Sequence, residues 1–159
     1  MKKILFVLMC MAVFMSLTAC QNKEPETVQI PNPFTEYKTI EEAEKAAGFS
    51  LALPAEWMNE LKEPTIRVSN DGLLELIFQL DDEEIRIRKA KTHEDISGDY
   101  TKYAVEKQVD LASLSITLKG DADLIHTAIW QDGEYSYAIS SQKGMKEDAI
   151  LSLIQKMQH

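Results

Sequence analysis

The sequence of 159 residues contains only two cysteines and three histidines. Cys10 and Cys20 both lie within the first 20 residues, so the rest of the chain can form neither a disulfide nor a thiolate metal site. The sequence also lacks G-x-S-x-G, H-E-x-x-H and the Asp-x-Asp-x-Asp-Gly calcium loop. These absences argue against a serine hydrolase, a zinc enzyme and an EF-hand protein. We therefore expect no catalytic residues, no bound metal and no cofactor.

Positive charge is also scarce. Lys and Arg number 17 against 26 Asp and Glu, which gives a formal net charge of −9. Lys2 and Lys3 precede Cys20 and no acidic residue does, so the chain from Cys20 onward carries −11. Nucleic-acid binding depends on Lys and Arg side chains that neutralise phosphates, and anionic membrane surfaces attract basic segments. The composition therefore argues against a nucleic-acid partner and against membrane binding through the domain itself.

A single long hydrophobic run is present, over residues 4–17, and only Ser16 interrupts it. Its 14 residues are too few for a membrane-spanning helix, which needs about 20. Lys2 and Lys3 precede the run and small residues follow it, which is typical of a secretory signal peptide. We therefore expect the run to be the core of a signal peptide.

The stretch Leu17-Thr18-Ala19-Cys20 resembles a bacterial lipobox, in which an aliphatic residue and two small residues precede a cysteine. This resemblance implies cleavage before Cys20 and a diacylglycerol group on its sulfur, and two lipid chains suffice for lasting membrane attachment. We expect residues 1–19 to be a lipoprotein signal peptide. The mature protein would then be anchored to the cell membrane on its extracytoplasmic side. The alternative is a secreted protein that is cleaved elsewhere, with Cys20 incidental.

The mature chain divides into a lipidated cysteine with a tether, residues 20–34, and one globular domain, residues 35–159. The tether holds three of the five prolines and shows no apolar periodicity. At the start of the domain, Thr39 and Glu42 predict a helix N-terminus, and Gly48 is placed to end that helix. Helical spacing near the C-terminus predicts a second helix, with Ile150, Leu153, Ile154 and Met157 on one face.

Between the two helices, apolar residues recur with the period of two that predicts strands. We expect a three-residue hairpin loop at 70–72 and a two-residue turn at 81–82. The apolar face selects the cross-strand pairs, which are Val68 with Leu74, Phe78 with Ile85, and Glu75 with Arg88. The predicted fold class is therefore α+β, an antiparallel sheet of about six strands backed by an N-terminal and a C-terminal helix.

A predicted hairpin near Asp132-Gly133 carries a cluster of aromatic residues. A two-residue turn would place Trp130 opposite Tyr135, with Tyr137 and His126 on the same face, whereas a three-residue loop would turn His126 away. Such a face can bind a ligand, a sugar or a peptide. The alternative is that the aromatic rings pack beneath the helices, as buried aromatic residues usually do. The candidate ligand-facing patch is thus Trp130, Tyr135, Tyr137 and His126.

The stretch TIEEAEKAAGFSLALPAEW, residues 39–57, is similar to the domain of unknown function numbered 4367, which is common in bacterial lipoproteins. The family pattern A-E-K-x-x-G-F-x-L-x-x-P is matched by Ala43, Glu44, Lys45, Gly48, Phe49, Leu51 and Pro54. The resemblance covers roughly residues 35–158. It implies a helix-backed antiparallel sheet and a location in the cell envelope, and it implies no known reaction.

Together these observations predict a lipid-anchored extracytoplasmic module of the bacterial cell envelope that binds a ligand or another protein. Its expected partners are the membrane, through the lipid on Cys20, and an envelope protein or an apolar ligand. Two alternatives remain, an envelope-associated hydrolase and a regulatory domain that restrains a membrane partner. A deep pocket with convergent polar groups would favour the hydrolase, and a shallow apolar patch would favour the other two.

Overall fold

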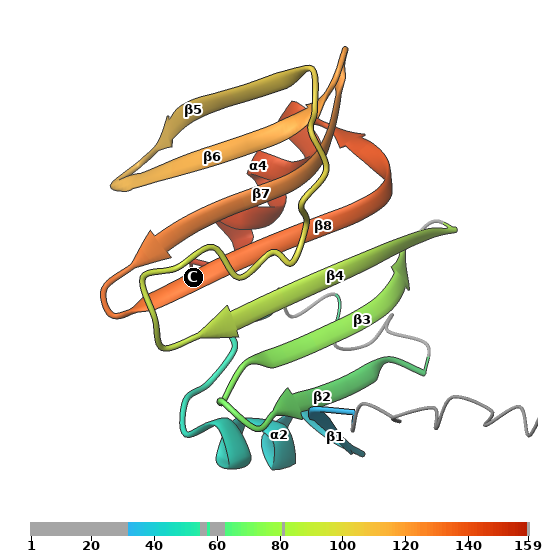
Figure 1. The fold of residues 1–159 in the computed structure, drawn as a ribbon, viewed down its shortest axis with the longest axis vertical. Coiled ribbons are helices and arrows are strands. Elements are labelled where there is room, and N and C mark those ends of the chain that lie inside the picture. The colour runs from blue at the N-terminus through green and yellow to red at the C-terminus, as the bar shows by residue number, and fades with distance from the viewer. Residues whose placement is uncertain (1–31, 55–56, 58–62, 81, 159) are drawn as a thin grey trace, which may run out of the picture. The chain divides into compact units, whose positions relative to one another are not determined.

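A computed structural model describes residues 32–54, 57, 63–80 and 82–158, all within one compact unit, Asn32–His159. The predicted signal peptide, Cys20 and most of the tether lie outside the described residues. Figure 1 shows the elements along the chain. The strands are β1 (Phe34–Tyr37), β2 (Thr65–Ser69), β3 (Leu74–Leu80), β4 (Glu83–Ala90), β5 (Val105–Leu111), β6 (Leu114–Asp121), β7 (Leu124–Asp132) and β8 (Tyr135–Lys146). The helices are α2 (Ile40–Ala47) and α4 (Glu147–Lys156).

The strands form one antiparallel sheet in the order β1-β2-β3-β4-β8-β7-β6-β5. Two four-stranded meanders, β1–β4 and β5–β8, join where β4 pairs with β8. The α+β class is confirmed, but the sheet has eight strands rather than the expected six or so. One strand that the sequence did not predict is β1, whose first residue, Phe34, had been assigned to the tether. Four residues are too few to show a period of two, and β1 forms by pairing with β2.

The register of the two predicted hairpins at 70–72 and 81–82 is confirmed. Val68 pairs with Leu74 across the 70–72 loop. In the next hairpin the pairs are Phe78 with Ile85, Leu76 with Ile87, and Glu75 with Arg88. Shifting either strand by one residue would have moved all of its apolar side chains to the other face, so burial of one face fixes the register.

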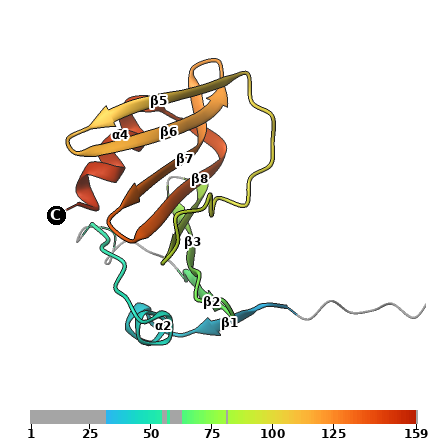
Figure 2. The ribbon, with the colours of Figure 1, turned by 60° about the vertical axis from the view of Figure 1, so that its left-hand side comes forward.

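Both helices lie on the same face of the sheet (Figure 2). Helix α2 begins at the predicted cap, where Thr39 Oγ1 accepts a hydrogen bond from the Glu42 amide, and ends at Gly48, whose φ is +82°. Helix α4 buries Ile150, Leu153 and Ile154. Between the helices and the sheet lies a core of aliphatic side chains, including Leu76, Ile87, Ile116 and Ile139.

No helix covers the other face of the sheet among the described residues. The connection between β4 and β5, residues 91–104, crosses this face instead (Figures 1 and 2). Arg88 holds the connection against the sheet, because its Nη1 donates to the carbonyl oxygens of Ile96 at 3.0 Å and Ser97 at 2.7 Å. Within the part of the chain that is described, no helix has the length and apolar character required to cross a bilayer.

Candidate functional site

The predicted aromatic patch is divided between the two faces of the sheet. Trp130 pairs with Tyr137 rather than with Tyr135, because the β7–β8 turn lies at 133–134, one residue later than expected. Trp130 is only 2% exposed, and its ring stacks on that of Tyr137 with the ring centroids 5.1 Å apart. Trp130 therefore belongs to the core beneath the helices.

The two tyrosines surround a lysine of the same chain. Lys89 Nζ lies 4.5 Å from the ring centroid of Tyr135, 5.0 Å from that of Tyr137 and 5.3 Å from that of Phe49. It also donates to the carbonyl oxygen of Ser50 at 2.6 Å, and Lys89 is only 8% exposed. Cation–π attraction and this hydrogen bond stabilise a nearly buried ammonium group. The aromatic rings are thus occupied by an internal partner.

His126 does not join these aromatic residues. The pairing of β7 with β8 is irregular between Ile125 and Thr127, and this β-bulge places His126 on the same face as Thr127, opposite to that of Trp130. There its ring stacks on Tyr103 with the centroids 5.3 Å apart. Its Nδ1 lies 3.3 Å from the carbonyl oxygen of Ser141. The expectation that His126 shares a face with the tyrosines is therefore wrong.

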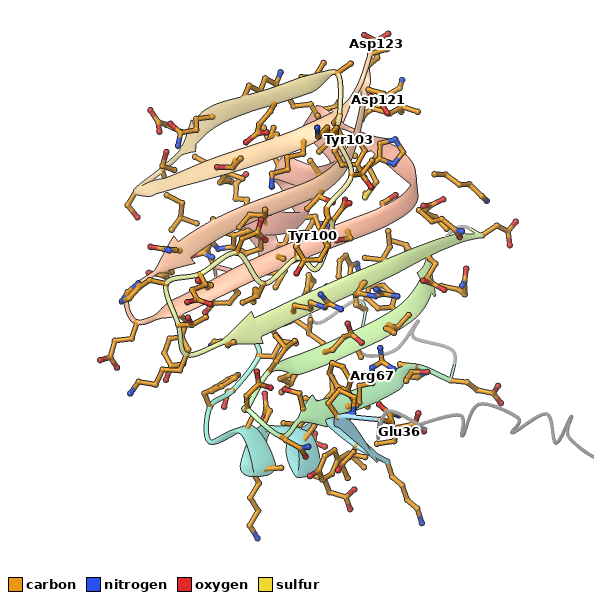
Figure 3. All side chains as sticks on the ribbon, in the orientation of Figure 1. Glu36, Arg67, Tyr100, Tyr103, Asp121 and Asp123 are labelled. Carbon is orange, nitrogen blue, oxygen red and sulfur yellow. The ribbon has the colours of Figure 1, made fainter. Side chains whose placement is uncertain are left out.

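His126 instead lines a cavity of about 370 Å³ on the face without helices. Strands β4, β7 and β8 form its floor, and the β4–β5 connection forms one wall. Figure 3 shows Tyr103 where this connection approaches β5. Polar side chains dominate the lining, among them Arg86, Asp99, Tyr103, His126, Thr127 and Ser140. This is the candidate functional site of the described residues.

Asp99 organises the wall of the cavity. Its Oδ2 accepts hydrogen bonds from the hydroxyls of Tyr103 at 2.6 Å and Thr127 at 2.7 Å, and its Oδ1 accepts one from the Thr101 amide at 3.0 Å. Burial opposes ionisation of Asp99, but these hydrogen bonds outweigh it and hold the pKa of this carboxyl well below its ordinary value. Asp99 therefore carries a negative charge at neutral pH, and its oxygens are already supplied with donors.

Beside the cavity, all three arginines of the chain surround one buried carboxylate, that of Glu75. Arg67 Nε lies 2.5 Å from Glu75 Oε1, and Arg88 Nε lies 2.6 Å from Glu75 Oε2. Arg86 Nε is more distant, at 3.6 Å from Oε2. Figure 3 shows Arg67 on β2, near the opposite edge of the sheet from Tyr103. We call these four residues the arginine cluster.

Sequence reasoning missed both the cavity and most of the arginine cluster. A signal for the cluster was present, because Arg67, Glu75, Arg86 and Arg88 all occupy the outward positions of the predicted hairpins. The expected pair of Glu75 with Arg88 is one of its contacts. The cavity had no comparable signal, since it depends on where a connection of 14 residues, 91–104, crosses the sheet.

Comparisons with family models, curated proteins and solved structures found no significant match to this chain. The resemblance to the domain numbered 4367 therefore stays a prediction. Within the described residues, no three His, Cys, Asp or Glu side chains converge in a way that could hold a metal ion. The site must accordingly be interpreted from its own geometry.

Proposed function

We propose that this chain is a lipid-anchored extracytoplasmic binding module, and that it binds its ligand in the cavity on the face of the sheet without helices. The observation that carries the proposal is the sequence Leu17-Thr18-Ala19-Cys20 after a short apolar run, which favours lipid attachment. The fold supports it, because one face of the sheet is occupied by the core while the other offers a polar cavity to solvent. A cavity of about 370 Å³ lies within the size range of sites for small molecules.

The polar lining of the cavity also bears on the alternative that the chain is a hydrolase. A serine–histidine nucleophile needs a hydroxyl within hydrogen-bond reach of the imidazole. Among the described residues, no Ser or Thr hydroxyl donates to His126; its Nδ1 lies 3.3 Å from the Ser141 carbonyl oxygen and its ring stacks on that of Tyr103. The Ser141 hydroxyl donates instead to Glu83 Oε1 at 2.7 Å. No serine–histidine pair is therefore formed among the described residues, and this arrangement favours binding over hydrolysis by such a pair.

Cys10 and Cys20 offer a matched test of the anchor. We expect Cys20→Ser to move the protein from the membrane fraction to the soluble fraction, because the thioether that carries the lipid cannot form. Cys10→Ser changes the same atom within the predicted signal peptide, so the variant should fractionate with membranes as the wild type does. The measurement is the distribution of the full-length chain between fractions after cell lysis. Retention of the Cys20→Ser variant in membranes would contradict the proposal.

A further inference from the structure

Arg86 differs from the two other arginines of the cluster in its hydrogen bonding. Arg67 and Arg88 each donate a hydrogen bond to one oxygen of Glu75. Among the described residues, Arg86 makes no hydrogen bond: its nearest carboxylates, those of Glu75 and Glu84, both lie 3.6 Å away, and its buried Nε has no partner. Because that distance exceeds the range of a good hydrogen bond, Arg86 remains a cation with donors to offer.

The Arg86 side chain is accessible from the cavity, while its Nε is buried beside Glu75. Arg86 lines the cavity, and its side chain is 34% exposed, whereas that of Arg88 is 13% exposed and is directed to the β4–β5 connection. By contrast, the Asp99 carboxylate opposite already accepts three hydrogen bonds. Glu84, the other carboxylate of the lining, lies 3.6 Å from Arg86 Nη2 and makes no hydrogen bond with it, so no acceptor among the described residues satisfies the Arg86 guanidinium. A carboxylate matches the planar fork of arginine with two parallel hydrogen bonds.

The remaining charges limit how much negative charge a ligand can carry. Glu84 and Asp99 also line the cavity and contribute two negative charges against the one positive charge of Arg86. A phosphate with two charges would be repelled strongly by Glu84 and Asp99. A single carboxylate can bind to Arg86 and direct the neutral groups of the ligand toward these two acidic side chains. Hydroxyl or amide groups suit the rest of the lining, which includes Ser140 and Gln142. The volume corresponds to a ligand of the size of a monosaccharide or a dipeptide.

We propose that the cavity binds a small, singly charged carboxylate ligand bearing hydroxyl or amide groups, and that Arg86 recognises its carboxylate. This inference rests on the proposed binding function and adds the chemical class of the ligand. The carboxylate can belong to a sugar acid or to the C-terminal end of a short peptide, and both present the same two oxygens to Arg86. The chemistry of the site is the same in the two cases, and the test separates them.

Isothermal titration of the full-length lipidated protein in detergent micelles provides the test, with probes in matched pairs. Glucuronate is compared with glucose, and N-acetylglycine with N-acetylglycinamide. We expect at least one carboxylate probe to bind about ten- to a hundredfold more tightly than its neutral partner, since charged hydrogen bonds contribute that much. The pair that shows the difference identifies the sugar or the peptide source. Equal affinities in both pairs, or tighter binding of inorganic phosphate, would overturn the proposal.

Two variants separate recognition from folding. Arg86→Gln should remove the preference for the carboxylate, whereas Arg67→Gln, in the same cluster but outside the cavity, should retain it. Equal loss in both variants, with both folded by circular dichroism, would count against Arg86. Should Arg86→Gln fail to fold, proton resonances of His126 and Tyr103 in the wild type give a second measurement. Saturable shifts with the carboxylate probe support the site, and unchanged resonances refute it.

The outcome for the ligand is distinguishable from the outcome for the proposed function. Absence of carboxylate preference refutes the ligand class, yet leaves the fractionation of the Cys20→Ser variant to decide the anchor. Conversion of a bound probe into a product, followed by chromatography, would contradict the binding function while supporting the cavity as the site. Recovery of the bound probe unchanged supports both the binding function and the cavity as its site.

Discussion

At the scale of single residues, Glu75 is a buried carboxylate that the three arginines surround. Its side chain is fully buried, and its two oxygens lie 2.5 Å and 2.6 Å from arginine nitrogens. Burying a carboxylate costs several kcal/mol, which the attraction of partly exposed arginines offsets only while all partners are in place. The register of β2, β3 and β4 therefore depends on the charges of the arginine cluster as well as on apolar packing.

Glu75→Gln should lower the free energy of unfolding by about 3 kcal/mol, because the neutral amide removes the carboxylate that Arg67 and Arg88 share and leaves Arg86 with Glu84 alone. Urea unfolding followed by circular dichroism measures the change. Glu106→Gln provides the control, since Glu106 is exposed on β5 and its replacement should change stability by less than about 0.5 kcal/mol. Equal effects of the two substitutions would show that the cluster does not stabilise the fold.

Single residues also show why part of the site could be predicted and part could not. The pair of Glu75 with Arg88 followed from the hairpin register, because opposite charges at facing outward positions attract. The position of His126 did not follow, because the bulge between Ile125 and Thr127 adds one residue to β7 and reverses the face that His126 occupies. A bulge in the middle of a strand leaves no turn residue in the sequence to mark it.

At the scale of elements, the β6–β7 hairpin depends on one glycine. Gly120 lies at an irregularity of the pairing, between Lys119 and Gly120, where the two backbones approach closely. A Cβ atom there would lie 2.0 Å from the carbonyl oxygen of Leu124. Since that oxygen belongs to the backbone, no side-chain rotation can relieve the contact. The hairpin can therefore form without distortion only if this position has no side chain.

Gly120→Ala should accordingly lower the free energy of unfolding by about 3 kcal/mol, as strong overpacking does. Gly133→Ala is the matched control: Gly133 has a φ of +57° but nothing within 4 Å of a Cβ, so only about 1 kcal/mol of backbone strain is expected. Both substitutions reduce the entropy of the unfolded chain alike, so this contribution cancels. The midpoints of urea unfolding measure the two changes in stability. A Gly120→Ala variant as stable as Gly133→Ala would contradict the close approach of the β6 and β7 backbones.

The elements that could be predicted are those whose own residues carry the signal. Apolar pairs such as Phe78 with Ile85 fixed a hairpin, and the cap at Thr39 fixed the start of α2. Strand β1 carries no such signal in its four residues. Its backbone becomes a strand because it pairs with the edge of β2, and this partner is not encoded in the four residues of β1 themselves.

At the scale of the whole molecule, the proposed function separates attachment from recognition. Attachment would depend on the lipid alone, since a chain that carries −11 from Cys20 onward is repelled by anionic headgroups. Recognition would depend on the cavity and on Arg86, on the face of the sheet that no described helix covers. A domain without a disulfide after Cys20 relies for its stability on the core under α2 and α4.

The mass of the mature N-terminus tests the central claim most directly. Mass spectrometry of N-terminal peptides from the full-length protein, purified from membranes, reports both the cleavage site and any modification. We expect the chain to begin at Cys20 and to carry the additional mass of a diacylglycerol thioether. A mature chain that begins elsewhere, or that begins at an unmodified Cys20, would contradict a lipid-anchored module.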